Sequence, residues 1–245
     1  MTTRAEFFSR ISAEMAKTRG LFPARTAPRP ADPRAVAGTI RRELAERWPA
    51  ALERFRREFE RVGGVFYRVA AFADVPQVVA GIAREREVRR LVAWDARELG
   101  GDLLPALEAR GLDPVAMPPG EVSAEERARL RRVVADAELG LTGADLAIAE
   151  TGTLVLRSGA GRPRSTSLLP PCHIAVFDRA ALVESLGQAG VVLELWHREE
   201  PPGTGGAVNF ITGPSRTADI ELTLTRGVHG PKEVHAIFVE APLHG

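Results

Sequence analysis

Three short segments of the sequence combine residue types that could do chemistry. They are residues 150–153 (ETGT), 212–221 (TGPSRTADIE) and 227–232 (GVHGPK). Each lies beside a short apolar run that is typical of a buried strand. Because ligands of open α/β sheets bind where strands end, these three segments are the first candidates for a functional site.

Glu150 closes the apolar run that precedes it and is followed by Thr151, Gly152 and Thr153. A carboxylate at the end of a buried strand costs free energy unless it has a partner or a role. Glu150 could be a nucleophile or a general base, with the two threonine hydroxyls as donors beside it. The alternative is that Glu150 caps the turn or pairs with an arginine.

Ser215, Arg216 and Thr217 follow a Gly-Pro turn after the apolar run 208–211. We expect a short helix to begin there, with Asp219 in its first turn. Hydroxyls, a guanidinium and free backbone N–H groups at a helix N-terminus form a reasonable site for a phosphate or carboxylate. The alternative is ordinary capping, because Ser or Thr before Asp and Glu also begins many helices.

His229 lies between that expected helix and the last apolar run, flanked by glycine, valine and proline. An exposed imidazole there could accept or donate a proton near neutral pH. The alternative is a simple turn residue. The five histidines show no metal-binding spacing such as H-E-x-x-H, so the sequence predicts no metal site.

The elements that must position these residues alternate between strands and helices. Apolar runs at 65–69, 91–94 and 114–117 are separated by helical patterns at 75–87, 103–110 and 123–139. This alternation predicts an α/β fold, a three-layer αβα arrangement around a mixed, mainly parallel sheet.

A hairpin is the exception to the parallel pattern. The apolar runs 146–149 and 154–156 are separated by four residues, which leaves no room for a crossover helix. They must therefore pair antiparallel. Further strands are expected at 173–177, 208–211 and 234–239, with a helix at 187–199. We expect one pocket to collect eight candidate residues: Glu150, Thr151, Thr153, Ser215, Arg216, Thr217, Asp219 and His229. Gly152, at the tip of the hairpin, is a further ligand-binding candidate.

We expect residues 1–62 to form an N-terminal helical segment and residues 63–245 to form the α/β domain. Trp48, Leu52, Phe55 and Phe59 make an apolar stripe at helical spacing. Pro49 predicts a kink or a fresh helix. The stripe either packs on the body of the protein or binds a partner.

Composition excludes several classes of protein. The chain has 245 residues, with 33 basic and 32 acidic side chains and a net charge of +1. This balance argues against a dedicated nucleic-acid binder. Cys172 is the single cysteine, so the chain cannot supply a cysteine zinc site or the thiolates of an iron–sulfur cluster. A lone thiol, no secretory signal and no apolar run long enough for a membrane span predict a cytoplasmic protein.

Four ordered motifs resemble the LUD-domain family: GADLAIAETGTLVL (143–156), LLPPCHIAVF (168–177), ITGPSRTADIE (211–221) and GVHGPKEVHAIFVE (227–240). The resemblance covers most of the chain from Gly64 onward. It implies a fold related to the ribose-phosphate isomerase, CoA-transferase and formyltetrahydrofolate cyclo-ligase group. It also implies a part in a three-protein bacterial system that oxidises L-lactate to pyruvate, whose other two proteins bind iron–sulfur clusters.

Two hypotheses of function follow. The chain is a component of L-lactate utilization, a non-iron–sulfur subunit or accessory factor that binds a small anionic ligand and contacts the iron–sulfur proteins or a second copy of itself. Alternatively, it is a free-standing enzyme that acts on an acyl or phosphorylated metabolite through Glu150. In both hypotheses Glu150 and His229 are the catalytic candidates, the other seven residues bind the ligand, and the chain itself holds no cofactor.

Overall fold

The computed structural model describes residues 3–17, 29–199, 206–218 and 224–243. The chain divides into two compact units, Met1–Ala31 and Asp32–Gly245. The first unit contains α1 (Arg4–Lys17). Thr3 and Glu6 cap this helix reciprocally, since each backbone N–H donates to the other side chain. The second unit contains all the other elements described below.

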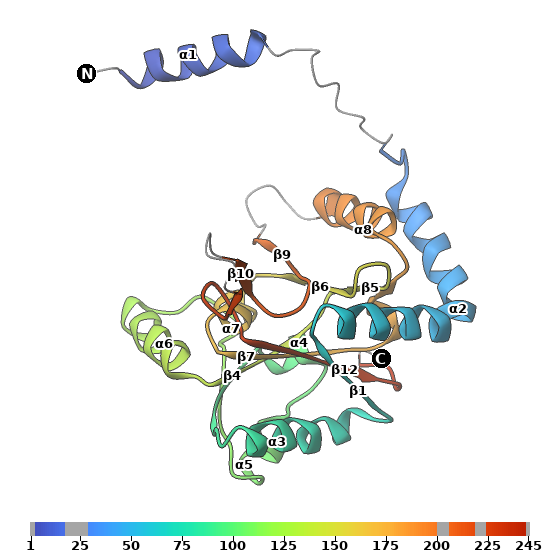
Figure 1. The fold of residues 1–245 in the computed structure, drawn as a ribbon, viewed down its shortest axis with the longest axis vertical. Coiled ribbons are helices and arrows are strands. Elements are labelled where there is room, and N and C mark those ends of the chain that lie inside the picture. The colour runs from blue at the N-terminus through green and yellow to red at the C-terminus, as the bar shows by residue number, and fades with distance from the viewer. Residues whose placement is uncertain (1–2, 18–28, 200–205, 219–223, 244–245) are drawn as a thin grey trace. The chain divides into compact units, whose positions relative to one another are not determined.

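The centre of the second unit is a six-stranded sheet with the order β1-β12-β7-β4-β2-β3 (Figure 1). Every pairing in it is parallel. The strands are β1 (Val65–Val69), β2 (Arg90–Ala93), β3 (Asp113–Ala116), β4 (Leu139–Gly143), β7 (Cys172–Phe177) and β12 (Glu233–Val239). β4 and β7 are buried along their whole length, as expected for parallel strands covered on both faces.

A second sheet has four strands in the order β8-β5-β6-β9. They are β5 (Leu146–Ile148), β6 (Thr153–Arg157), β8 (Leu182–Val183) and β9 (Val208–Ile211). β5 and β6 pair antiparallel, with Ile148 opposite Thr153, so the predicted hairpin is confirmed. The hairpin belongs to this second sheet, whereas the sequence analysis placed it in the central one.

Helices cover the central sheet on both faces, and the predicted α/β fold is confirmed. Figure 1 shows α3 and α5 on one side, and α2, α8 and the second sheet on the other. The helices are α2 (Pro33–Arg61), α3 (Val75–Glu85), α4 (Ala96–Leu99), α5 (Leu104–Glu108), α6 (Ala124–Asp136), α7 (Ser165–Leu168) and α8 (Leu186–Glu199), with short 3-10 turns η1 (Phe72–Asp74) and η2 (Arg179–Ala181). No helix among the described residues is long and apolar enough to cross a membrane.

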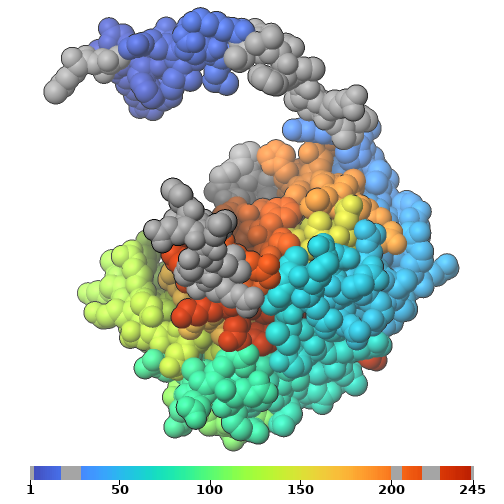
Figure 2. All heavy atoms as spheres, in the orientation of Figure 1, coloured from blue at the N-terminus to red at the C-terminus, as the bar shows by residue number. Residues whose placement is uncertain are grey.

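The apolar stripe of α2 is part of the core. Leu52, Phe55 and Phe59 are fully buried, and the Phe55 ring lies 5.2 Å from that of Phe177 on β7. Burying each such side chain stabilises the fold by about 1.5–3 kcal/mol. Pro49 lies inside α2, so no fresh helix begins there. The burial of these side chains confirms the interpretation that the stripe packs on the body of the protein. The opposite, outer surface of α2 runs along one side of the face shown in Figure 2.

The prediction of a short helix after Pro214 is wrong. Residues Arg216–Ala218 form strand β10, which pairs antiparallel with β11 (Leu224–Arg226). Thr217 and Thr225 lie opposite each other in this ladder. Threonine is β-branched and favours extended backbone, and here that preference prevails over the capping pattern.

Candidate functional site

A cavity of about 370 Å³ opens at the carboxyl ends of three neighbouring parallel strands, β2, β4 and β7. Trp94 follows β2 directly, Asp145 lies two residues after β4, and Asp178 follows β7 directly. Parallel strands bring their carboxyl ends to one edge of the sheet, where α/β proteins bind ligands. The lining residues are Arg41, Trp94, Arg97, Glu98, Gly143, Ala144, Asp145, Arg157, Arg162, Val176, Phe177, Asp178, Ala180, Ala181, Trp196 and Leu243.

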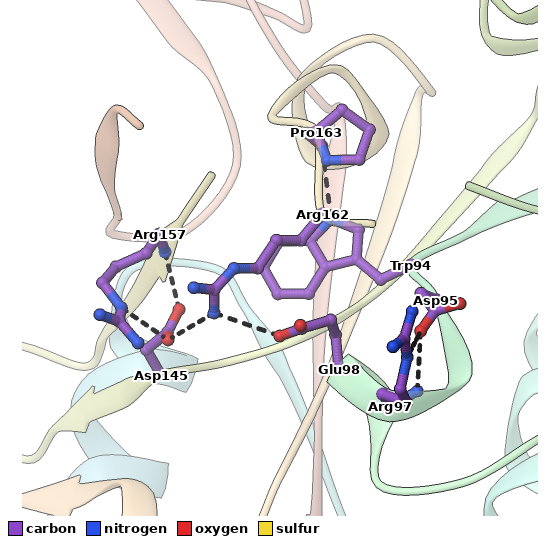
Figure 3. Close-up of polar contacts among 8 residues, drawn as sticks. All are labelled: Trp94, Asp95, Arg97, Glu98, Asp145, Arg157, Arg162 and Pro163. Carbon is purple, nitrogen blue, oxygen red and sulfur yellow. Dashed lines mark hydrogen bonds and ion pairs between the residues drawn. The ribbon is translucent and has the colours of Figure 1, made fainter. Parts of the chain in front are cut away.

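Asp145 organises the polar wall of this cavity. Its Oδ2 accepts the backbone N–H of Arg157 at 2.7 Å, and its Oδ1 accepts the Arg157 Nε–H at 3.0 Å. The same Oδ1 accepts a hydrogen bond from Arg162 Nη1 at 3.2 Å. The Asp145 side chain is only 10% exposed, so both charge-assisted bonds are shielded from water (Figure 3).

Arg162 links two elements across the cavity. Its Nη1 lies 3.2 Å from Glu98 on α4 as well as from Asp145 (Figure 3). The neighbouring carbonyl of Pro163 accepts the Trp94 indole N–H at 3.3 Å. The N–H of Asp95 donates to the Gly161 carbonyl at 2.8 Å. These bonds tie the loop after β6 to the ends of β2 and β4 and fix the position of the Arg162 guanidinium.

The lining of the cavity is rich in guanidinium and aromatic groups. The Arg157 guanidinium lies 4.1 Å from the centre of the Trp196 ring, a cation–π contact. Arg97 donates to Asp95, and this hydrogen bond holds the pKa of the Asp95 carboxyl below its usual range. Arg41 on α2 has no hydrogen-bond or ion-pair partner for its side chain within the described part of the chain. The described contacts of Arg162 engage Nη1 alone, although a guanidinium has five N–H donors. Such a lining suits a small anion.

Asp178 is a second buried carboxylate of the lining. Its Oδ1 accepts the N–H of Ala180 at 2.8 Å, and its Oδ2 accepts the N–H of Leu243 at 2.7 Å. Asp178 therefore anchors Leu243, near the end of the chain, beside the cavity.

The structure places Glu150 at the start of α8. Its Oε2 accepts the N–H of Leu186 at 3.0 Å, and the side chain is exposed. This bond caps the start of α8, whereas the alternative given for Glu150 was to cap its own turn or to pair with an arginine. Glu150 is absent from the lining of the cavity. A catalytic role for Glu150 stays a prediction.

The other residues of the hairpin tip face α2. Gly152 has φ +61°, and a Cβ there would lie 2.3 Å from the backbone nitrogen of Phe59. The hydroxyls of Thr151, Thr153 and Thr212 form a chain, with Oγ1–Oγ1 distances of 2.7 and 2.8 Å. The tip is thus packed between α2 and the segment after β9.

The two late segments meet each other. The Ser215 N–H donates to the Pro231 carbonyl at 2.9 Å, and the Gly227 N–H donates to the Ser215 carbonyl at 3.0 Å. His229 lies in the loop that these bonds close and is exposed. The Arg216 guanidinium donates to the Val62 carbonyl at the end of α2. Thr217 is described only as part of the β10 backbone, and Asp219 lies outside the described residues.

These contacts connect Thr151, Thr153, Thr212, Ser215 and the loop around His229 near the end of α2. The hydrogen bonds of Glu150 lead instead to Glu184 and Leu186, at the start of α8. The sequence analysis missed Trp94, Glu98, Asp145 and Asp178. A signal was present for Asp178, which directly follows the apolar run 173–177.

A second polar cluster lies at the opposite edge of the sheet, at the amino ends of β7 and β12. Cys172, Glu233 and His235 offer ligand atoms within 4.8 Å of one another. However, the Arg86 guanidinium pairs with Glu233, and its Nη2 lies 3.4 Å from His235 Nε2. A cation of the protein itself therefore occupies this cluster. Burial raises the pKa of Glu233, but hydrogen bonds from Arg86 and His235 outweigh burial and lower it overall.

The comparison with family models now identifies the class of protein. The model described as the LUD domain matches residues 52–239, and the chain belongs to this family. A crystal structure of a DUF162 family protein from Deinococcus radiodurans has the same fold, with a TM-score of 0.53 and 22% identity over 78% of this chain and 97% of that one.

Individual relatives point to one branch of the family. The chain is 36% identical to lactate utilization protein C of Halalkalibacterium halodurans over 167 aligned residues. The aligned region covers 67% of this chain and 68% of the relative. It is 42% identical to lactate utilization protein C of an Exiguobacterium species over 109 aligned residues. That aligned region covers 44% of this chain and 47% of the relative. The resemblance to the LUD-domain family found in the sequence is confirmed.

Proposed function

We propose that this chain is a component of the bacterial L-lactate utilization system and binds a small carboxylate in the cavity at the ends of β2, β4 and β7. The names of its relatives support the system. The observation that supports the site is the set of four arginines around one cavity, of which Arg41 has no partner in the described part of the chain. A small carboxylate such as lactate or pyruvate matches the charge of this lining and is small enough to enter the cavity.

The ordered arginines would orient such a ligand. Arg157 is fixed between Asp145 and the Trp196 ring, and Arg162 is fixed between Asp145 and Glu98. Preformed donors bind an anion without the entropic cost of ordering long side chains. Arg41 is exposed and has no side-chain partner among the described residues, so it supplies positive charge that none of the described carboxylates pairs with.

Partners belong to the same proposal. The chain holds no iron–sulfur cluster itself, because Cys172 is its single cysteine. It works in the cytoplasm with partner proteins that do hold such clusters. Co-expression with the iron–sulfur proteins of the same lactate-utilization system tests this part. We expect them to copurify, with iron in proportion to the partners. Iron in proportion to this chain when it is purified alone would contradict it.

The binding test compares Arg41→Ala with Arg42→Ala. The two residues are neighbours on α2, and both are exposed, but only Arg41 lines the cavity. Loss of one charge-assisted hydrogen bond, about 1.5–3 kcal/mol, should weaken pyruvate or L-lactate binding roughly tenfold to a hundredfold. Calorimetric titration measures this, and Arg42→Ala should bind like the wild type.

Growth on L-lactate tests the biological role. A strain that lacks the gene should fail to grow on L-lactate and should be rescued by the wild type and by Arg42→Ala. Rescue by Arg41→Ala should be weaker. Normal growth of the deletion strain would remove the assignment to lactate utilization, whereas equal rescue by both variants would remove only the proposed site.

A further inference from the structure

A second cavity, of about 340 Å³, lies beside α6. It is separated from the first by a single turn, because Gly159, Gly161 and Pro163 line this cavity whereas Arg162 lines the other. The two cavities share no lining residue. Its volume falls within the range of about 300–1,000 Å³ that is usual for ligand pockets.

The walls of this cavity are apolar. Met117, Leu130 and Val134 are buried and belong to the small core between β2 and α6. At the edge, Leu169 is 61% exposed, although leucine gains free energy by burial. An exposed leucine beside an apolar hollow indicates that a ligand can cover both.

The rim of the cavity is cationic. Arg127 and Arg131 are one turn apart on the same face of α6, and both line the cavity. Both are exposed, and neither side chain has a hydrogen-bond or ion-pair partner in the parts of the chain that the structure describes. None of the described lining residues has a carboxylate, in contrast to the first cavity, where Asp145 and Glu98 pair with arginines.

We infer that this cavity binds an acyl carboxylate of medium length. The acyl chain covers Met117, Leu130 and Leu169, and the carboxylate lies between Arg127 and Arg131. Both parts of the ligand are needed. A neutral hydrocarbon leaves the two guanidinium groups unpaired, and an anion as small as lactate leaves the apolar walls in contact with water.

Octanoate is the probe, and octanol is its neutral counterpart. Anilinonaphthalene sulfonate reports on binding, because it combines an apolar ring system with an anion and fluoresces when it leaves water. With the full chain at neutral pH, octanoate should displace the dye, and octanol should do so about tenfold less well. The Arg127→Ala/Arg131→Ala double variant should bind octanoate about tenfold more weakly and lose the distinction from octanol.

Arg132→Ala is the matched control. Arg132 is exposed on the same helix, but it does not line the cavity, so this variant should behave as the wild type. Leu169→Asp tests the apolar edge without disturbing the core and should also weaken octanoate. Thermal unfolding verifies that each variant folds. The inference is overturned if octanoate displaces no dye from the wild type, or if displacement is unchanged in both the double variant and Leu169→Asp.

Discussion

Asp145 and Arg157 are joined twice, once through the Arg157 backbone N–H at 2.7 Å and once through its Nε at 3.0 Å. The Asp145 carboxylate therefore fixes both the backbone of Arg157 and the guanidinium group at the end of its side chain. Because Arg162 bonds the same carboxylate, Asp145 sets the geometry of the polar wall.

The first prediction is that Asp145→Asn destabilises the protein by about 2–4 kcal/mol. It removes the charge that compensates two largely buried guanidinium groups, and breaking a buried pair from one side leaves a charge uncompensated. Urea unfolding measures the free energy of unfolding. Asp113→Asn is the control, because Asp113 and Arg89 are 3.9 Å apart and both exposed, and its effect should stay within about 0.5 kcal/mol. Equal stabilities of the two variants would contradict the role of Asp145.

The second prediction concerns Gly152 at the tip of the hairpin. Gly152→Ala should cost about 3 kcal/mol or more, because the residue has φ +61° and the new Cβ would lie 2.3 Å from the Phe59 nitrogen. The three nearest atoms are all backbone atoms of Glu58 and Phe59, so no side chain can move aside to relieve the contact. Thermal or urea unfolding measures the loss.

Gly81→Ala is the matched control for Gly152→Ala. Gly81 lies inside α3, and nothing lies within 4 Å of a Cβ built there. Alanine should stabilise that helix by up to about 1 kcal/mol. If Gly152→Ala retained wild-type stability, the close approach of the hairpin to α2 would be wrong.

The hairpin and the alternation of strands and helices were predictable from local patterns. Four residues between two apolar runs leave one way to connect them, and the capping of α6 by Ser123 was visible as Ser followed by Glu126. β4 was missed because Leu139 fitted the end of a preceding helix and Leu141 fitted the start of the hairpin run. Without β4, Asp145 did not stand out as a residue after a strand.

The cavity itself was not predictable, because it depends on which strands are neighbours. β7, β4 and β2 adjoin in the sheet although they are far apart and out of order along the chain. Glu98 and Arg162 meet only through that order. The threonines 151 and 153 stood out by composition, but composition could not show that Gly152 lies against the backbone of α2.

The third prediction is a loss of stability in mild acid caused by His173. This residue is fully buried on β7, and burial, followed by the charge of His235, lowers its pKa to about 3. In the unfolded chain its pKa is about 6.5. Between these values the unfolded state binds the proton and the folded state does not, so stability falls as pH falls below about 6.5. From pH 7.5 to pH 5 this contributes roughly 2 kcal/mol.

His235 adds to the same trend, because burial also lowers its pKa. Free energies of unfolding at pH 7.5 and pH 5 should therefore differ less for His173→Gln than for the wild type. His229→Gln, at an exposed position, should keep the wild-type difference. NMR of the imidazole gives an independent reading on the wild type, and a His173 signal that titrates near pH 6.5 would contradict this account.

The last prediction is that the Cys172 thiol is unreactive in the folded protein. Cys172 begins β7 and is 4% exposed, and burial raises the pKa of its thiol to about 12, although Arg86 acts in the opposite direction. Only the thiolate is a nucleophile, so at pH 8 its population is about a thousandfold below that of an ordinary cysteine. Ellman's reagent should leave the native protein unlabelled over many minutes and should label one thiol per chain at once in urea, since the sequence has a single cysteine. Arg86→Ala should not speed labelling, because it removes the neighbouring positive charge that favours the thiolate. Rapid stoichiometric labelling of the native protein would show that the amino end of β7 is open to solvent.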